Sequence, residues 1–117
     1  MSDIKLEKLG TGYGGWYVPE NMSLNENSII YSAGVGEDIS FDLLLQCKYN
    51  CNIMLIDPTL KAIKHFDEVK QYYNSKQLFT GNIQNDYYSC IQLLHPNFNK
   101  FTYMNIGLWN KKDDLKF

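Results

Sequence analysis

The chain has 117 residues, of which 44% are hydrophobic and 15% aromatic, so it is long enough for one domain with a modest core. Its 11 basic residues are all lysines and its formal net charge is −2, which argues against a dedicated nucleic-acid surface. No apolar run approaches the ~18 residues of a membrane-spanning helix, and the N-terminus lacks the pattern of a secretory signal. We therefore expect one cytoplasmic domain over residues 1–117, with neither a nucleic-acid nor a membrane partner.

The cysteines and histidines do not form a pattern of metal ligands. The three cysteines are odd in number, at Cys47, Cys51 and Cys90, and the two histidines, His65 and His95, lie thirty residues apart. Free thiols in a reducing compartment are the simplest interpretation, with Cys47 buried on one face of a helix. No metal site is expected.

Residues 1–27 form a glycine- and aromatic-rich N-terminal segment. A run of four glycines between positions 10 and 15 is followed by Trp16, Tyr17 and Pro19. The run does not predict a phosphate-binding loop, because no strand is expected before it and no helix after it. It predicts a turn whose aromatic side chains cap the edge of a sheet.

Residues 28–117 have the pattern of an α/β domain. The expected elements are strands at 28–32, 53–56 and 101–108, helices at about 38–49, 59–74 and 87–94, and a turn at 111–114 into a short strand at 115–117. The second strand is continuously apolar, as is typical of a strand buried on both faces of a parallel sheet. We predict a Rossmann-like parallel sheet with flanking helices.

The glycine turn after the first strand indicates a nucleotide site. Gly34 and Gly36 allow the backbone to turn sharply and to approach a ligand closely. The N-terminus of the following helix offers unpaired N–H groups. Asp57 ends the second strand 21 residues after Gly36, about where a carboxylate meets a ribose diol.

Two departures from the dinucleotide motif G-x-G-x-x-G argue against NAD. The third glycine would fall at Ile39, and Glu37 and Asp38 bring negative charge to the mouth of the helix. Two carboxylates near a diphosphate would each cost on the order of 1 kcal/mol. A cofactor without phosphate, carrying a sulfonium and an ammonium group, avoids this repulsion, so side-chain charge favours S-adenosylmethionine.

The motif YSAGVGEDISFD at 31–42, followed by IDPT at 56–59, resembles the first nucleotide-binding motif and second-strand acid of FkbM-type methyltransferases. Blocks at 13–19 and 105–117 also resemble that family, in the same order. The family consists of class I S-adenosylmethionine-dependent enzymes. The resemblance implies that residues 13–19 cover the cofactor pocket, as an alternative to capping the sheet. Together with the glycine turn, it gives these cofactor-binding residues: Ser32, Ala33, Gly34, Gly36, Glu37, Asp38, Asp57 and Pro58.

The sequence also differs from the pattern of class I methyltransferases at two positions. Many class I methyltransferases have an acidic residue where Ser32 stands and a third glycine where Asp38 stands. The family's substrate and catalytic residues come largely from the fourth strand onward, beyond the strands expected here. The chain therefore resembles the cofactor-binding half of an O-methyltransferase acting on a small-molecule or glycan acceptor, with unknown catalytic residues.

Two other functions stay open from the sequence. The chain could be a non-catalytic module that binds S-adenosylmethionine, another nucleotide or a partner, or a fragment of a nicotinamide-dependent oxidoreductase. In class I methyltransferases the fourth strand lies beside the first. Without it, Ile29, Ile30 and Tyr31 would form an exposed apolar edge through which the chain could self-associate.

Overall fold

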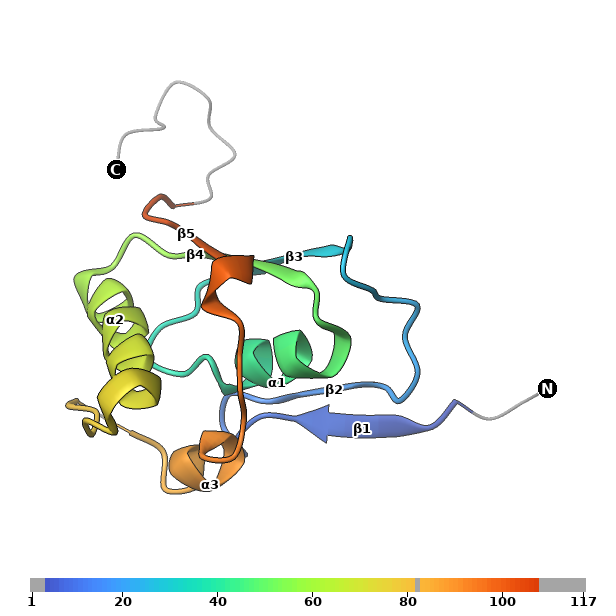
Figure 1. The fold of residues 1–117 in the computed structure, drawn as a ribbon, viewed down its shortest axis with the longest axis horizontal. Coiled ribbons are helices and arrows are strands. Elements are labelled where there is room, and N and C mark those ends of the chain that lie inside the picture. Colours follow the sequence, from blue (N-terminus) through green and yellow to red (C-terminus); the bar gives the residue numbers. More distant parts are fainter. Residues whose placement is uncertain (1–3, 82, 108–117) are drawn as a thin grey trace.

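In the computed structural model, which describes residues 4–81 and 83–107, the chain has a mixed α/β fold (Figure 1). Its elements are β1 (Leu6–Leu9), β2 (Trp16–Pro19), β3 (Ile29–Ala33), α1 (Ser40–Tyr49), β4 (Asn52–Ile56), α2 (Leu60–Ser75), α3 (Tyr87–Ile91), a 3-10 turn (Phe98–Lys100) and β5 (Phe101–Met104).

The main sheet is parallel and has the order β3-β4-β5. Ile30 and Tyr31 pair with Ile53 and Met54 across the β3–β4 ladder. The predicted parallel sheet with flanking helices is confirmed among the described residues. Its central strand is β4, whose Ile53 and Leu55 are buried on one face. On the other face Ile56 is buried but Met54 is only partly buried, so the predicted burial on both faces holds in part.

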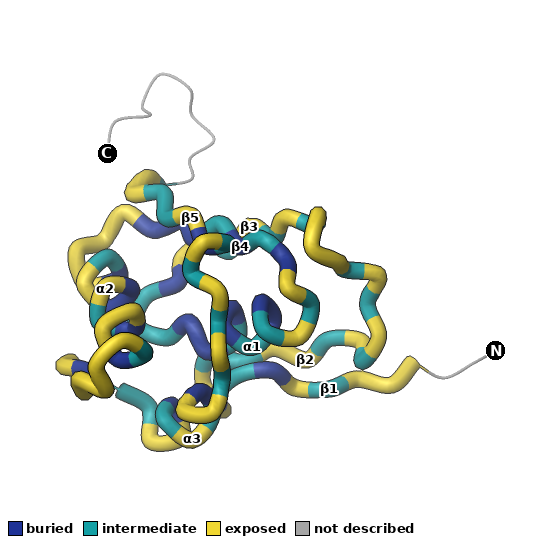
Figure 2. The backbone as a smooth tube through the Cα atoms, viewed as in Figure 1, coloured by how far each residue is buried: buried dark blue, intermediate teal, exposed yellow. Residues whose placement is uncertain are grey.

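Helices α1 and α2 lie on the same side of this sheet (Figure 1), and buried residues gather between the helices and the strands (Figure 2). Thr59 caps α2, because its hydroxyl accepts a hydrogen bond from the amide of Ala62. Ala62, Phe66 and Val69, spaced four and three residues apart, are buried on one face of α2. The helices and the sheet therefore share one core.

The absence of a strand before the glycine run was a wrong prediction. β1 precedes the run and pairs antiparallel with β2, so residues 10–15 connect a hairpin. Leu9 is the buried residue of β1, whereas the other three side chains are partly or fully exposed. A strand with so little buried surface lacks a clear apolar pattern, which is why the sequence did not reveal it.

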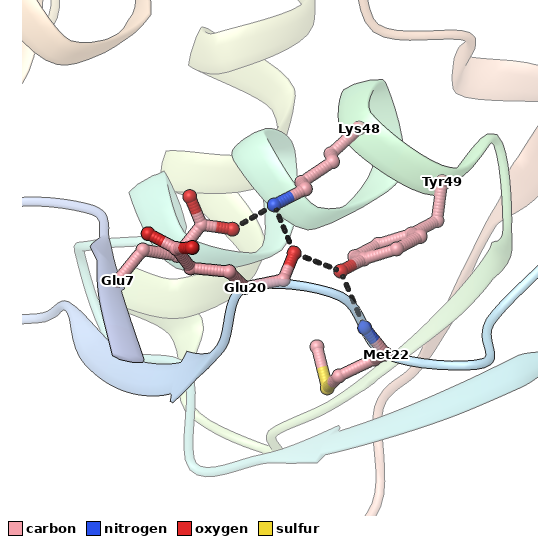
Figure 3. Close-up of polar contacts among 5 residues, drawn as sticks. All are labelled: Glu7, Glu20, Met22, Lys48 and Tyr49. Carbon is pink, nitrogen blue, oxygen red and sulfur yellow. Dashed lines mark hydrogen bonds and ion pairs between the residues drawn. The ribbon is translucent and has the colours of Figure 1, made fainter. Parts of the chain in front are cut away.

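The hairpin is fastened to the last turn of α1 (Figure 3). Lys48 forms an ion pair with Glu7 of β1 and donates a hydrogen bond to the carbonyl of Glu20 at 2.7 Å. The hydroxyl of Tyr49 donates to the same carbonyl at 3.3 Å and accepts from the amide of Met22 at 3.2 Å. Helix α1 thus lies between the sheet and the hairpin.

Several predicted boundaries shift. Helix α1 begins at Ser40 instead of residue 38, α3 ends at Ile91 instead of 94, and β5 ends at Met104, although it was predicted to reach 108. Cys47 is half-buried, which corrects the prediction of a buried thiol. Residues 108–117, including the predicted turn and last strand, lie outside the described part of the chain.

Strand β3 forms one edge of the three-stranded sheet. Ile29 is 53% exposed and Tyr31 is 66% exposed, and both alternate with Ile30, which packs against the core. The predicted apolar edge is therefore present among the described residues. None of the helices in this part of the chain is long and apolar enough to cross a membrane.

Candidate functional site

The glycine turn lies at the carboxyl end of β3 and opens onto space. Gly34 has a φ of +71° and Gly36 a φ of +56°, a region that L side chains rarely adopt. A Cβ atom added at either glycine would meet nothing within 4 Å. The amide of Gly34 donates to the carbonyl of Ile56 at 2.8 Å, so the turn sits directly beside the end of β4.

A cleft of about 810 Å³ extends from this turn to the hairpin. Its lining comprises Ser32, Ala33, Gly34, Val35, Gly36, Glu37, Asp38, Phe41 and Asp42 around the turn, Tyr13, Gly14, Gly15 and Trp16 from the hairpin, and Lys61 and Gln84. Six of the eight predicted site residues lie in this lining: Ser32, Ala33, Gly34, Gly36, Glu37 and Asp38. Residues 13–16 thus form one wall of the cleft.

Asp57 and Pro58, the other two predicted residues, lie outside the lining. Asp57 is buried, and its Oδ2 accepts a hydrogen bond from the amide of Gly36 at 3.0 Å. Its Oδ1 accepts from the amide and the hydroxyl of Thr59 at 2.9 and 2.7 Å. A carboxylate has about four acceptor positions, so Oδ2 keeps one for a further donor. Asp57 therefore ties the glycine turn to the start of α2.

Asp38 is held by the hairpin loop. Its Oδ2 accepts from the hydroxyl of Thr11 at 2.6 Å, and its Oδ1 accepts from the amide and hydroxyl of Ser40 at 2.9 and 2.6 Å. The hydroxyl of Thr11 also accepts from the amide of Gly14 at 2.8 Å. These contacts fix the loop over the N-terminus of α1.

The glycine at position 14 is needed for this contact. A Cβ atom there would lie 2.6 Å from the carboxyl group of Asp38, whereas one at Gly12 would lie 3.7 Å from Asp86, an ordinary contact. We expect Gly14→Ala to lower the free energy of unfolding by about 1–3 kcal/mol through overpacking. Urea unfolding of both alanine variants measures the difference. A loss at Gly12→Ala equal to that at Gly14→Ala would contradict this explanation.

Behind the cleft, a chain of hydrogen bonds supports the start of α1. The hydroxyl of Tyr87 accepts from the amide of Ile39 at 3.0 Å and lies 2.6 Å from Nε2 of His65. Burial lowers the pKa of His65 and raises the pKa of Tyr87 well above its usual value. The Tyr87 hydroxyl therefore keeps its proton and lies beside a neutral imidazole.

Asp42 is a site residue that the sequence analysis missed. It lies in the first turn of α1, four residues after Asp38, which precedes the helix; it is 3% exposed and lines the cleft. Burial raises its pKa to about 7; a hydrogen bond from Ser32 opposes this rise and the charge of Asp38 adds to it. In the helix predicted to begin at residue 38, the spacing of four residues would place both carboxylates on one face, and this was the available signal; in the structure Asp38 precedes α1.

The charges of the lining are mostly negative. Glu37, Asp38 and Asp42 contribute carboxylates, and Lys61 contributes the one ammonium group of the described lining. Tyr13 and Trp16 add exposed aromatic rings at the hairpin wall. Carboxylates and aromatic faces both attract cations, so this cleft favours a positively charged ligand over a diphosphate.

Comparisons of the chain with protein-family models, with curated proteins and with solved structures find no match.

Proposed function

We propose that this chain binds S-adenosylmethionine in the cleft and supplies the cofactor-binding part of a methyltransferase. The observation that carries the proposal is the glycine turn with open space above it, at the edge of a cleft lined mostly by carboxylates. A cationic cofactor without phosphate is compatible with both features. The resemblance of residues 31–42 and 56–59 to FkbM-type enzymes gives the same cofactor.

The residues present fit such a group. Because neither Gly34 nor Gly36 has a side chain and the space beside both is open, part of the ligand could contact their backbone directly. Asp57 lies outside the cleft lining, but its Oδ2 holds the Gly36 amide at the edge of the cleft and keeps one acceptor position that a ribose hydroxyl could use. The carboxylates of the lining suit the ligand's positive charges.

When bound, the cofactor supplies an already activated methyl group, so positioning of the two reactants provides much of the rate. The role of this chain is to hold and orient the cofactor and to exclude water with the hairpin wall. We propose transfer to a hydroxyl oxygen of a small-molecule or glycan acceptor. The thiols of Cys47, Cys51 and Cys90 are free, which supports a cytoplasmic setting.

Titration calorimetry with S-adenosylhomocysteine and, separately, with NADH tests the proposal. We expect S-adenosylhomocysteine to bind and NADH not to bind. Gly36→Val should abolish binding because its side chain would occupy the open space, whereas Gly12→Ala should bind normally. Binding of NADH alone would favour the nicotinamide-dependent alternative, and binding of neither ligand would remove the proposed function.

We also propose self-association through β3. Its backbone edge is unpaired among the described residues, and Ile29 and Tyr31 are exposed beside it. Sedimentation velocity should find dimers or larger species that Tyr31→Lys converts to monomers. Leu60→Lys removes an even more exposed apolar side chain, 83% against 66% for Tyr31, from α2 and serves as the control. A wild-type chain that stays monomeric at high micromolar concentration would contradict this expectation.

A further inference from the structure

Asp42 is the one carboxylate of the described cleft lining that is almost entirely buried. Its side chain is 3% exposed and belongs to the first turn of α1. Ile39 and Leu43, which lie close to it in the sequence, are also buried. One carboxyl oxygen, Oδ1, has no hydrogen-bond donor among the described residues although it is inaccessible to solvent. The nearby Ser32 side chain lowers the pKa of this carboxyl group, opposing the effect of burial.

An acceptor buried without a donor is unfavourable, and native proteins rarely retain one. Asp38, the neighbouring carboxylate, has donors on both oxygens from Thr11 and Ser40. Asp42 has no such arrangement, although it borders a cleft large enough for a ligand. Its missing donor is therefore expected from the ligand side.

We propose that Asp42 is the anionic anchor of the cleft and accepts a hydrogen bond from an ammonium group of the ligand. This inference rests on the proposed function, in which that group is the amino group of the methionine portion of S-adenosylmethionine. A sulfonium has no N–H or O–H to donate, whereas an ammonium group has three donors. The carboxyl group of Asp42, which borders the cleft and has no donor on Oδ1, therefore matches the ammonium end of the ligand. Ser32, whose side chain is near enough to lower the pKa of Asp42, is then a positioning residue for this carboxyl group.

Charge around Asp42 makes the binding proton-linked. Its facing titratable groups are Asp38 and Tyr87, and Glu37 and Lys61 share the cleft. With a pKa of about 7, the free carboxyl group is about half protonated at pH 7. An arriving ammonium group favours its ionised form, so binding at pH 7 should release about half a proton.

The test compares two probes by titration calorimetry at pH 7. S-adenosylhomocysteine carries the ammonium group, whereas 5′-methylthioadenosine has the same nucleoside and thioether without it. We expect Asp42→Asn to lower the affinity for S-adenosylhomocysteine about tenfold. Asp42→Leu should lower this affinity further, because leucine has no hydrogen-bond acceptor. Affinity for 5′-methylthioadenosine should stay the same. Asp67→Asn, an exposed carboxylate of α2 outside the cleft, is the matched control.

Titrations in two buffers of different ionisation enthalpy count the protons released. The wild-type chain should release about half a proton and Asp42→Asn none. If both Asp42 variants bind S-adenosylhomocysteine as tightly as the wild type, Asp42 does not bind the ammonium group, whereas the proposed cofactor is still supported. If the wild-type chain binds neither probe, the proposed function fails and the anchor fails with it. Circular dichroism of each variant verifies that it is folded, and the two variants give independent measurements.

Discussion

Asp57→Ala should lose both cofactor binding and stability. The carboxylate of Asp57 accepts three hydrogen bonds, from Gly36 and from the amide and hydroxyl of Thr59. Burial opposes its ionisation, but these hydrogen bonds hold the pKa of Asp57 below its usual value. Removing a charged acceptor of this kind leaves the Gly36 amide unpaired, and we expect the free energy of unfolding to fall by about 2–4 kcal/mol.

Thr59→Ala separates the two roles of Asp57. This control removes one donor to Asp57 and the cap of α2, at a cost of about 1 kcal/mol, but leaves the Gly36 contact in place. Urea unfolding and S-adenosylhomocysteine titration of both variants provide the measurements. We expect Thr59→Ala to bind normally and Asp57→Ala to bind at least tenfold more weakly. Normal binding by a folded Asp57→Ala variant would show that Asp57 neither contacts the ligand nor shapes the turn.

The sequence predicted the elements that form the sheet because their patterns are local. A continuous apolar run is sufficient to indicate β4, and Thr59 before an amphipathic stretch is sufficient to indicate the start of α2. The hairpin lacked such a signal, since β1 and β2 bury little surface and depend on contacts with α1, such as the Lys48–Glu7 ion pair. That ion pair joins residues 41 positions apart, which no local pattern reveals.

The candidate site was predictable where backbone geometry defines it. Gly34 and Gly36 both have positive φ, which glycine adopts without strain and other residues rarely do. Charge alone did not reveal which carboxylates face inward. Asp38 and Asp57 are engaged by neighbouring donors, whereas Asp42 is left with an unpaired oxygen. Side-chain hydrogen bonds across the fold decide this difference, and they require the hairpin and α1 to be placed.

Asp42→Asn should make the protein more stable at alkaline pH. The pKa of Asp42 is about 7 in the folded chain, against a model-peptide value of 3.8. Between these values the folded state binds more protons than the unfolded state, so the contribution of Asp42 to stability is complete below pH ~4 and is lost as the pH rises through 7. Asparagine resembles the protonated acid and carries no such pH dependence. The difference between the two pKa values corresponds to a loss of about 4 kcal/mol in the free energy of unfolding once the pH is well above 7.

Urea unfolding of wild type and Asp42→Asn from pH 4 to 9 measures this effect, with Asp67→Asn as the exposed control. The two curves should coincide near pH 4 and diverge above pH 6, with Asp42→Asn the more stable, whereas Asp67→Asn should follow the wild type within about 0.5 kcal/mol. A gain in stability combined with a loss of ligand affinity is typical of a binding group that is unfavourable without its ligand. Equal stability of wild type and Asp42→Asn at pH 9 would mean that Asp42 ionises freely in the folded chain, and its carboxylate would then have no need of a donor from the ligand.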